Sequence, residues 1–114
     1  MTKDRRDLAL TGPMGAGKTT AGRLLAGFLG WSFVDLDQLI EEREGRGVPA
    51  LFAEGEPVFR AAEARAVRWW LERPKDAAPE VLALGGGTLQ NAELAEALAR
   101  RAYLFHLDAP AGVL

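Results

Sequence analysis

The sequence predicts a single α/β domain in which a parallel β-sheet is covered by helices on both faces. Strand-like and helix-like stretches alternate along the 114 residues, and this alternation is typical of parallel strands joined by right-handed helical crossovers. The strand-like stretches are short and mostly apolar, as strands buried on both faces are. A glycine-rich stretch, residues 12–20, joins the first strand to the first helix. We therefore expect the order β-α-β-α-α-α-β-α-β.

The N-terminal part of the chain predicts the first strand and the first helix. Residues 7–11 form a short apolar run that Gly12 and Pro13 end at once, which favours a buried strand over a helix. Apolar residues at helical spacing then extend over residues 18–29, and Gly30 is the expected stop. The residues expected to pack on the sheet are Ala21, Leu24, Leu25, Phe28 and Leu29.

The middle of the chain predicts a second strand and three helices. Residues 31–35 carry β-forming side chains into an acidic turn, which indicates a strand. A solvated charged face followed by glycines indicates a short helix over residues 39–44, and Pro49 suits the first turn of another over residues 48–52. The longest helix is expected over residues 58–73. Its buried face is expected to contain Val58, Ala61, Ala62, Ala66, Trp69 and Trp70.

The last part of the chain predicts a third strand, a helix and a fourth strand. Residues 81–84 are wholly apolar and run directly into three glycines, as a buried strand that ends in a turn does. Asn91 is a suitable cap for the helix that follows. Residues 103–107 again carry β-forming side chains and predict a strand ending at Asp108. The helical side chains expected to face inward are Leu94, Ala95, Leu98 and Ala102.

Composition places the chain among ordinary globular domains. Hydrophobic residues make up 48% of the sequence, charged residues 26%, and the formal net charge is −2, values that argue against disorder. A charge so close to zero gives no electrostatic basis for binding nucleic acid or a membrane surface, and no apolar run approaches membrane-spanning length. The absence of cysteine excludes disulfides and thiolate metal sites. Since the first strand leaves no room for a secretory signal, we expect a cytoplasmic protein, and a monomer.

A P-loop is the strongest chemical signal in the sequence. Gly12, Gly17, Lys18 and Thr19 fill the spacing G-x-x-x-x-G-K-[ST] between a strand and a helix, the setting that this motif requires. Glycines let backbone N–H groups turn toward a polyanion, and the following helix directs its positive end at the phosphates. Lys18 suits the β- and γ-phosphates, and the Thr19 hydroxyl suits Mg²⁺. A glycine-rich turn with an incidental lysine is the alternative.

Two acidic residues follow the second strand, at the edge where open α/β sheets bind ligands. Asp35 and Asp37 point the same way if the chain is still extended, whereas a helix that starts between them splays them. Either geometry allows one carboxylate near a magnesium shell and one on an acceptor hydroxyl, where it orients the nucleophile or takes its proton. The alternative is that one of the two merely caps the next helix.

An arginine and a glycine triplet complete the candidate site. Arg60 and Glu63 are three residues apart on a helix, so they form either a surface ion pair or a guanidinium that Glu63 holds in place for a ligand carboxylate. The pattern leaves both interpretations open. The three glycines at 85–87 indicate close approach of the backbone to a ligand or to the P-loop, with a mobile hinge as the alternative.

Four stretches together resemble the shikimate kinase family in order and approximate spacing. They are residues 12–20, the Asp35-Leu36-Asp37 step, the segment from Phe52 to Phe59-Arg60-x-x-Glu63, and residues 81–87. The resemblance implies a P-loop kinase fold of the nucleoside monophosphate kinase type. It also implies ATP-dependent phosphorylation of the 3-hydroxyl of shikimate, with ATP and Mg²⁺ as cofactors and shikimate as the small-molecule substrate.

On the donor side, the resemblance assigns roles to the P-loop and to the first acidic residue. Thr19 would ligate Mg²⁺, and Asp35 would support the metal shell through water. Lys18 and Asp37 would be catalytic. The residues expected to bind the phosphates of ATP are Gly15, Ala16, Gly17, Lys18, Thr19 and Thr20.

On the acceptor side, the resemblance assigns roles to side chains and to the glycine triplet. Asp37 would contact the shikimate hydroxyls, and Arg60 would bind the shikimate carboxylate with Glu63 behind it. Gly86 would approach the substrate through its backbone. The other residues expected around the substrate are Phe52, Phe59, Gly85 and Gly87.

The chain departs from the family in its length. Shikimate kinases continue into a mobile lid, and the lid's catalytic arginine, a further arginine for the carboxylate, the fifth strand and the adenine-binding loop have no counterpart here. We therefore expect residues 1–114 to be a single P-loop kinase core that lacks the lid and the last strand, with Lys18 alone insufficient for transfer. The alternatives are a non-catalytic nucleotide-binding P-loop module and a gluconate-type kinase, which accounts less well for Arg60 and Glu63.

Overall fold

The computed structural model describes residues 6–13 and 17–107, and these residues form one parallel four-stranded sheet. Its strands follow the order β2-β3-β1-β4, and each neighbouring pair is parallel. The parallel α/β class predicted from the sequence is confirmed. The strands are β1 (Asp7–Thr11), β2 (Ser32–Asp35), β3 (Glu80–Ala83) and β4 (Ala102–His106).

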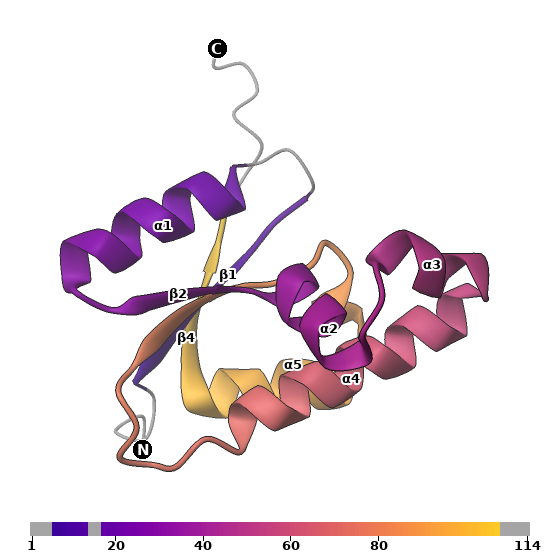
Figure 1. The fold of residues 1–114 in the computed structure, drawn as a ribbon. Coiled ribbons are helices and arrows are strands. Elements are labelled where there is room, and N and C mark those ends of the chain that lie inside the picture. The colour runs from indigo at the N-terminus through magenta and orange to yellow at the C-terminus, as the bar shows by residue number, and fades with distance from the viewer. Residues whose placement is uncertain (1–5, 14–16, 108–114) are drawn as a thin grey trace.

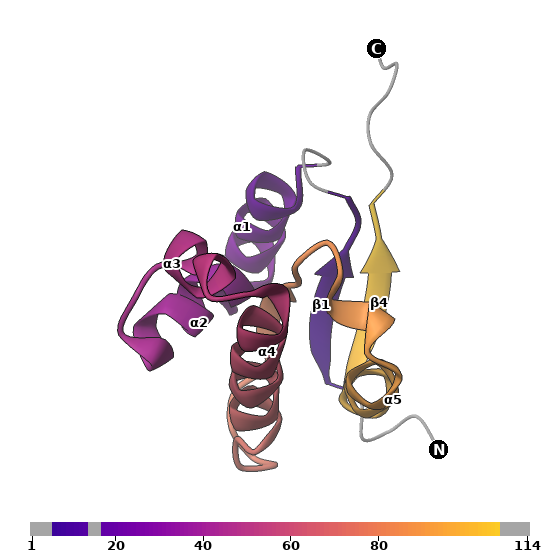
Figure 2. The ribbon, with the colours of Figure 1, turned by 90° about the vertical axis from the view of Figure 1, so that its right-hand side faces the viewer.

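Helices cover the sheet on both faces, as Figure 1 shows, with α1 on one side and α4 and α5 on the other. The order of elements is the predicted one, with an additional 3-10 turn after the glycine triplet. Figure 2 shows β1 and β4 side by side, with α5 leading into β4. The helices are α1 (Lys18–Leu29), α2 (Leu36–Glu44), α3 (Val48–Ala53), α4 (Glu56–Leu71) and α5 (Ala92–Arg101), and the 3-10 turn is Thr88–Gln90.

The strand register brings three connecting segments to one edge of the sheet. Leu10 pairs with Ala83, and Ala83 pairs with Asp35, so β1, β3 and β2 end close to the same level. Because all strands run the same way, the P-loop, the start of α2 and the glycine triplet follow these strands at one edge. That edge is where ligands bind in sheets of this kind.

The larger core lies between the sheet and the helices α2 to α5. Ala9, Leu82 and the half-buried Val34 and Leu104 form one row across the sheet by register, and they face this core. Each Å² of apolar surface that this cluster removes from water contributes about 25 cal/mol to the stability of the fold. Its largest fully buried apolar side chains are Leu36, Ile40, Leu51, Val67, Trp70, Leu82, Leu94 and Leu98.

The packing face predicted for α1 is wrong in part. Leu24 is 71% exposed and Phe28 is 89% exposed, whereas the buried residues of this helix are Gly22 and Ala26. The reason is close approach: a Cβ on Gly22 would lie 2.3 Å from the Phe33 ring, so the helix meets the sheet through its small residues. Leu24 and Phe28 therefore do not pack on the sheet and are exposed to solvent.

Three other packing details differ from the sequence-based expectation. Ala61 and Trp69 of α4 are exposed, and the Arg43 guanidinium stacks over the Trp69 ring at 4.4 Å. Ala102 is buried, but it belongs to β4 and not to the preceding helix. The helix expected from residue 39 begins three residues earlier, at Leu36, because Asp35 caps it.

Among the described residues, no helix has the length and hydropathy needed to cross a membrane.

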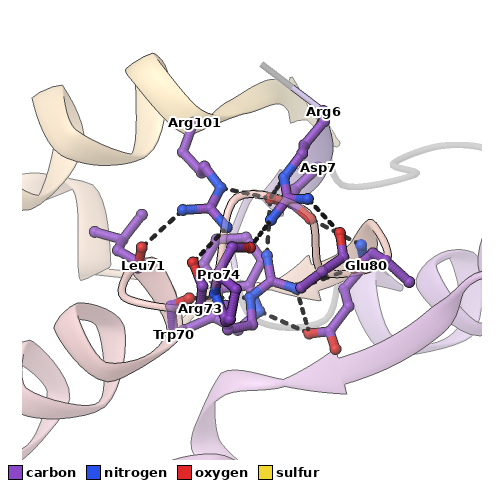
Figure 3. Close-up of polar contacts among 10 residues, drawn as sticks. Arg6, Asp7, Trp70, Leu71, Arg73, Pro74, Glu80 and Arg101 are labelled. Atoms are coloured by element: carbon purple, nitrogen blue, oxygen red, sulfur yellow. Dashed lines mark hydrogen bonds and ion pairs between the residues drawn. The ribbon is translucent and has the colours of Figure 1, made fainter. Parts of the chain in front are cut away.

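An ion cluster lies at the opposite end of the sheet from the P-loop, where the strands begin (Figure 3). The fully buried Asp7 carboxylate lies 2.8 Å from Arg73 Nη2 and 3.2 Å from Arg101 Nε, and its Oδ1 accepts the N–H of Glu80 at 2.8 Å. Arg101 also donates to the carbonyl of Leu71 at 2.7 Å. These contacts fasten the end of α4 to β1, β3 and α5.

Candidate active site

A crevice of about 320 Å³ opens at the carboxyl edge of the sheet. It lies between the start of α1, the start of α2 and the glycine triplet that follows β3. Several residues predicted from the sequence for the site are therefore brought together. The lining residues are Gly17, Lys18, Thr19, Thr20, Asp35, Asp37, Ala83, Leu84, Gly85 and Gly86.

The described part of the P-loop has the backbone that its glycines allow. Gly17 has φ +88°, a left-handed conformation, directly before α1 begins at Lys18. At Gly12 a Cβ would lie 2.4 Å from the carbonyl oxygen of Leu107, so glycine is required there by space as well as by its φ of +146°. Lys18 Nζ donates to the carbonyls of Gly12 and Pro13. The other two predicted loop residues, Gly15 and Ala16, lie outside the described residues.

Asp35 joins the P-loop helix to α2. Its Oδ1 accepts the N–H groups of Asp37 at 2.9 Å and Gln38 at 3.4 Å, which makes it the cap of α2. Its Oδ2 accepts a hydrogen bond from Thr19 Oγ1 at 3.3 Å. The helix-cap interpretation is therefore correct for Oδ1 of Asp35. The other oxygen, Oδ2, is hydrogen-bonded to the Thr19 hydroxyl, which is predicted to hold a metal.

Asp37 sits in a group of carboxylates at the crevice. Because α2 begins at Leu36, between the two acidic residues, the extended geometry does not apply and the splayed one does. Desolvation raises the pKa of Asp37 above its usual value, and the negative charges of Asp35, Glu63 and Glu41 raise it further, while Lys18 lowers it. Such a carboxylate has more affinity for a proton than an isolated aspartate.

Arg60 lies against Gly87 of the glycine triplet and is hydrogen-bonded to Glu63. Arg60 Nη1 donates to Glu63 Oε1 at 2.9 Å, and Arg60 Nε donates to Glu56 Oε2 at 3.3 Å. The bond to Glu63 raises the pKa of Arg60 further above its usual value. A Cβ on Gly87 would lie 2.7 Å from Arg60 Nη2. The arginine is thus more than an ordinary surface pair, since its partner Glu63 is only 2% exposed.

The two predicted phenylalanines stack beside Arg60. The ring centroids of Phe52 and Phe59 are 4.3 Å apart with an interplanar angle of 19°, and Arg60 Cζ lies 5.2 Å from the Phe59 ring centroid. Phe59 is buried, whereas Phe52 is 43% exposed. These aromatic side chains restrict where the guanidinium can lie.

The glycine triplet fits closely against the acidic side chains. A Cβ on Gly85 would lie 3.4 Å from Glu63 Oε2 and 3.7 Å from Asp37 Oδ1, so the backbone reaches both carboxylates. At Gly86 a Cβ would meet no atom within 4 Å. Arg60, Glu63 and the two phenylalanines do not line the crevice itself. Glu63 borders Gly85, which does line it, and Arg60 borders Gly87, which does not.

Sequence reasoning missed two site residues, Glu56 and Thr88. Glu56 precedes Arg60 by four residues on α4, a spacing that signals an ion pair on a helix. Thr88 is fully buried and its Oγ1 donates to Glu63 Oε2 at 2.8 Å. The available signal was weak: a threonine three residues after Gly85 can accept that residue's N–H, as it does here at 2.9 Å.

The topology and the crevice define the class of this protein. A parallel sheet with the order β2-β3-β1-β4 and a phosphate-binding loop after β1 has the P-loop kinase fold of the nucleoside monophosphate kinase type. The family model described as shikimate kinase matches residues 14–114. The chain belongs to the shikimate kinase family.

Individual relatives agree with this assignment. The shikimate kinase of Psychrobacter cryohalolentis is 46% identical over 114 residues, which cover 99% of this chain and 59% of that protein. A solved structure of shikimate kinase from Acinetobacter baumannii, in complex with shikimate, matches with a TM-score of 0.82 and 39% identity over 94% of this chain and 60% of that one. The chain thus spans about three fifths of the length of these relatives.

The gluconate alternative is less well supported. A gluconokinase from Sinorhizobium meliloti matches with a TM-score of 0.56 and 16% identity, over 88% of this chain and 55% of that one. At that identity the likeness shows a shared fold alone. The family match and the relatives above favour the shikimate kinase interpretation.

Proposed function

We propose that this protein acts as a shikimate kinase, transferring the γ-phosphoryl group of ATP to the 3-hydroxyl of shikimate. The observation that carries the proposal is the position of Arg60, which Glu63 holds against the glycine triplet beside the P-loop crevice. Family membership supports it. So does the A. baumannii relative, whose solved structure contains shikimate.

The donor side fits a magnesium-bound triphosphate. The N-terminus of α1 and Lys18 supply positive charge at the crevice, and Lys18 can exchange its carbonyl partners for phosphate oxygens. Thr19 Oγ1 and Asp35 Oδ2 lie 3.3 Å apart, a hydroxyl and a carboxylate of the hard oxygen type that Mg²⁺ prefers. Thr19 and Asp35 would hold Mg²⁺ there, and the metal would supply positive charge that offsets the charge of the phosphates.

The acceptor side fits a molecule with a carboxylate and hydroxyl groups. The planar guanidinium of Arg60 suits a bidentate bond to a carboxylate. Asp37, at the crevice, would orient the attacking hydroxyl and accept its proton.

The charge at the crevice indicates what else the reaction needs. Among the crevice-lining residues that the structure describes, Lys18 is the one cationic side chain, facing Asp35 and Asp37. Arginines at the transferring phosphoryl group contribute about 10³ to 10⁵ in rate in related reactions. We therefore propose that residues 1–114 form a P-loop kinase core and that full turnover requires cationic groups from a lid beyond it.

A phosphotransfer assay tests this function directly. Shikimate, gluconate and water are offered as acceptors with ATP·Mg²⁺, using this chain and a version extended to the length of its relatives. The proposal predicts shikimate 3-phosphate from the extended version and at least tenfold less from this chain. Nucleotide binding with no transfer by either version would support the non-catalytic alternative, and equal turnover by both would refute the need for a lid.

A further inference from the structure

Thr88 and Glu63 connect the glycine triplet to Arg60 through three consecutive hydrogen bonds. The N–H of Gly85 donates to Thr88 Oγ1 at 2.9 Å, and Thr88 Oγ1 donates to Glu63 Oε2 at 2.8 Å. Glu63 Oε1 in turn accepts from Arg60 Nη1 at 2.9 Å. Thr88 Oγ1 therefore accepts one bond and donates the next, and each oxygen of the Glu63 carboxylate accepts one bond.

The burial of this line makes each bond consequential. Thr88 is fully buried and Glu63 is 2% exposed, so water does not readily replace a lost partner. A buried carboxylate requires hydrogen-bond donors on both oxygens, and Thr88 supplies the donor on the oxygen that Arg60 leaves free. With both oxygens bound, the plane of the carboxylate is fixed, and the direction in which it holds Arg60 is fixed with it.

Packing reinforces the same arrangement. A Cβ on Gly85 would lie 3.2 Å from Thr88 Oγ1 and 3.4 Å from Glu63 Oε2, so the backbone rests on both groups. On the other side, the guanidinium of Arg60 packs so closely on Gly87 that a Cβ there would lie 2.7 Å from Nη2. The 3-10 turn that begins at Thr88 brings these contacts together.

We propose that Thr88 is a positioning residue that sets the orientation of Arg60 through Glu63. This inference rests on the proposed function, in which Arg60 binds the carboxylate of the acceptor. Thr88 itself touches no substrate. Its hydroxyl determines how accurately the guanidinium is placed, and its loss weakens acceptor binding more than nucleotide binding.

Two substitutions separate the hydroxyl from the volume of the side chain. Thr88→Val keeps the shape but removes both hydrogen bonds, and it leaves the Gly85 N–H and Glu63 Oε2 without partners. Thr88→Ser keeps the hydroxyl and loses only a methyl group. Leu98→Val, a core change in α5 at a fully buried position, is the control for a loss of stability alone.

Steady-state kinetics of the active, extended protein give the first readout. We expect Thr88→Val to raise the KM for shikimate about tenfold, equivalent to about 1.4 kcal/mol, with the KM for ATP changed less than twofold. Thr88→Ser should stay within about threefold of the parent, and Leu98→Val should lower Tm without changing either KM. An equal rise in both KM values for Thr88→Val, or no rise in either, overturns the proposal.

A second readout does not depend on the acceptor. The Nε–H resonance of Arg60, assigned by its loss in Arg60→Lys, should shift or broaden in Thr88→Val and keep its position in Thr88→Ser. An unchanged resonance in Thr88→Val would show that Thr88 does not position Arg60. If the extended protein without substitutions fails to phosphorylate shikimate, the proposed function fails. The Arg60 resonance alone then decides whether Thr88 positions Arg60.

Discussion

The two ends of the sheet each hold arginines against carboxylates, and they differ in how far the arginine side chains are exposed. At the amino end, Asp7 is fully buried, and the side chains of Arg73 and Arg101 are 12% and 15% exposed. At the carboxyl end, the Arg60 side chain is 35% exposed above the buried Glu63. We infer that arginine and carboxylate pairs stabilise the fold at the amino end and present an arginine to a ligand at the carboxyl end. The exposure of the arginine side chain distinguishes the two ends.

In the amino-end cluster, Arg6 and Arg101 have partners within the protein, whereas the buried Arg73 Nη2 has an ion-pair contact with Asp7 but no hydrogen bond. Arg101 donates to the carbonyls of Leu71 and Arg73, and Arg6 donates to those of Pro74 and Ala77, all at the end of α4 or just beyond it. These guanidiniums bind the carbonyl of Leu71, which the end of α4 leaves free, and three carbonyls of the loop that follows. No comparable set of carbonyls surrounds Arg60 in the described contacts, so its guanidinium keeps donors for a ligand.

The largest effect that would sharpen this comparison is on stability. Asp7→Asn leaves the buried guanidiniums without their shared charge, and we expect a loss of about 3–5 kcal/mol in the free energy of unfolding. Denaturant unfolding measures this loss. The KM values of the folded fraction should not change, since the cluster lies at the end of the sheet opposite to the crevice.

The control for Asp7 is an exposed ion pair. Glu96 and Arg100 lie 3.0 Å apart with side chains 70% and 71% exposed, so Glu96→Gln should change the unfolding free energy by less than about 0.5 kcal/mol. If Asp7→Asn costs no more than Glu96→Gln, the amino-end cluster is not the stabilising device that its burial indicates.

The next effect concerns the carboxyl end. Gly87→Ala places a methyl group 2.7 Å from Arg60 Nη2, and the guanidinium, as the far end of a flexible side chain, must shift. We expect the KM for shikimate to rise about tenfold with a Tm change of less than about 4 °C. Gly27→Ala, where a Cβ meets no atom within 4 Å, is the matched control and should leave both KM values unchanged.

The smallest effect is a gain in stability at the site. The pKa of Asp37 is higher in the folded protein than in the unfolded chain, so its contribution is fully present below the usual aspartate range and is lost as pH rises through the raised pKa. Because asparagine does not ionise, the Asp37→Asn variant does not lose this stability as the pH rises. At pH 7 we expect Tm to increase by only about 1–2 °C, because Asp37 is exposed by surface area and solvent weakens the effect of its partial desolvation, while activity falls.

The pH dependence supplies the check on Asp37. Thermal unfolding of both proteins between pH 4 and pH 8 should show a difference that grows with pH and is close to zero at the acid end. A variant that is less stable than the parent at pH 7 would mean that the carboxylate stabilises the fold, contrary to its raised pKa.

The sequence predicted the order of elements because apolar runs ended by glycine are strong local signals. It did not predict the packing face of α1, since large and small residues both recur at helical spacing. Close contact with Phe33 requires Gly22, and Ala26 packs in a cluster with Leu10 and Val81. It also missed the role of Asp7, whose bond to Glu80 spans 73 residues. Long-range contacts of this kind leave no local pattern.

For the site, the P-loop and the two acidic residues were predictable because motif spacing carries their chemistry. The interpretation of Arg60 stayed open, since a spacing of three residues on a helix fits both a surface pair and a supported ligand. The contacts with Gly87 and with the buried Glu63 favour a supported arginine, and its role as a ligand for the acceptor stays a prediction. Thr88 emerged only from its position against Glu63.

Calorimetric titration with shikimate and, separately, with ATP·Mg²⁺ tests the central claim most directly, in the parent protein and in Arg60→Ala. Arg65→Ala, on the same helix and paired with Glu44 at 2.9 Å, is the control. The account predicts that Arg60→Ala weakens shikimate binding about 100-fold, changes ATP·Mg²⁺ binding less than about threefold, and that Arg65→Ala changes neither. Equal weakening of both ligands by Arg60→Ala, or no binding of shikimate by the parent protein, would contradict it.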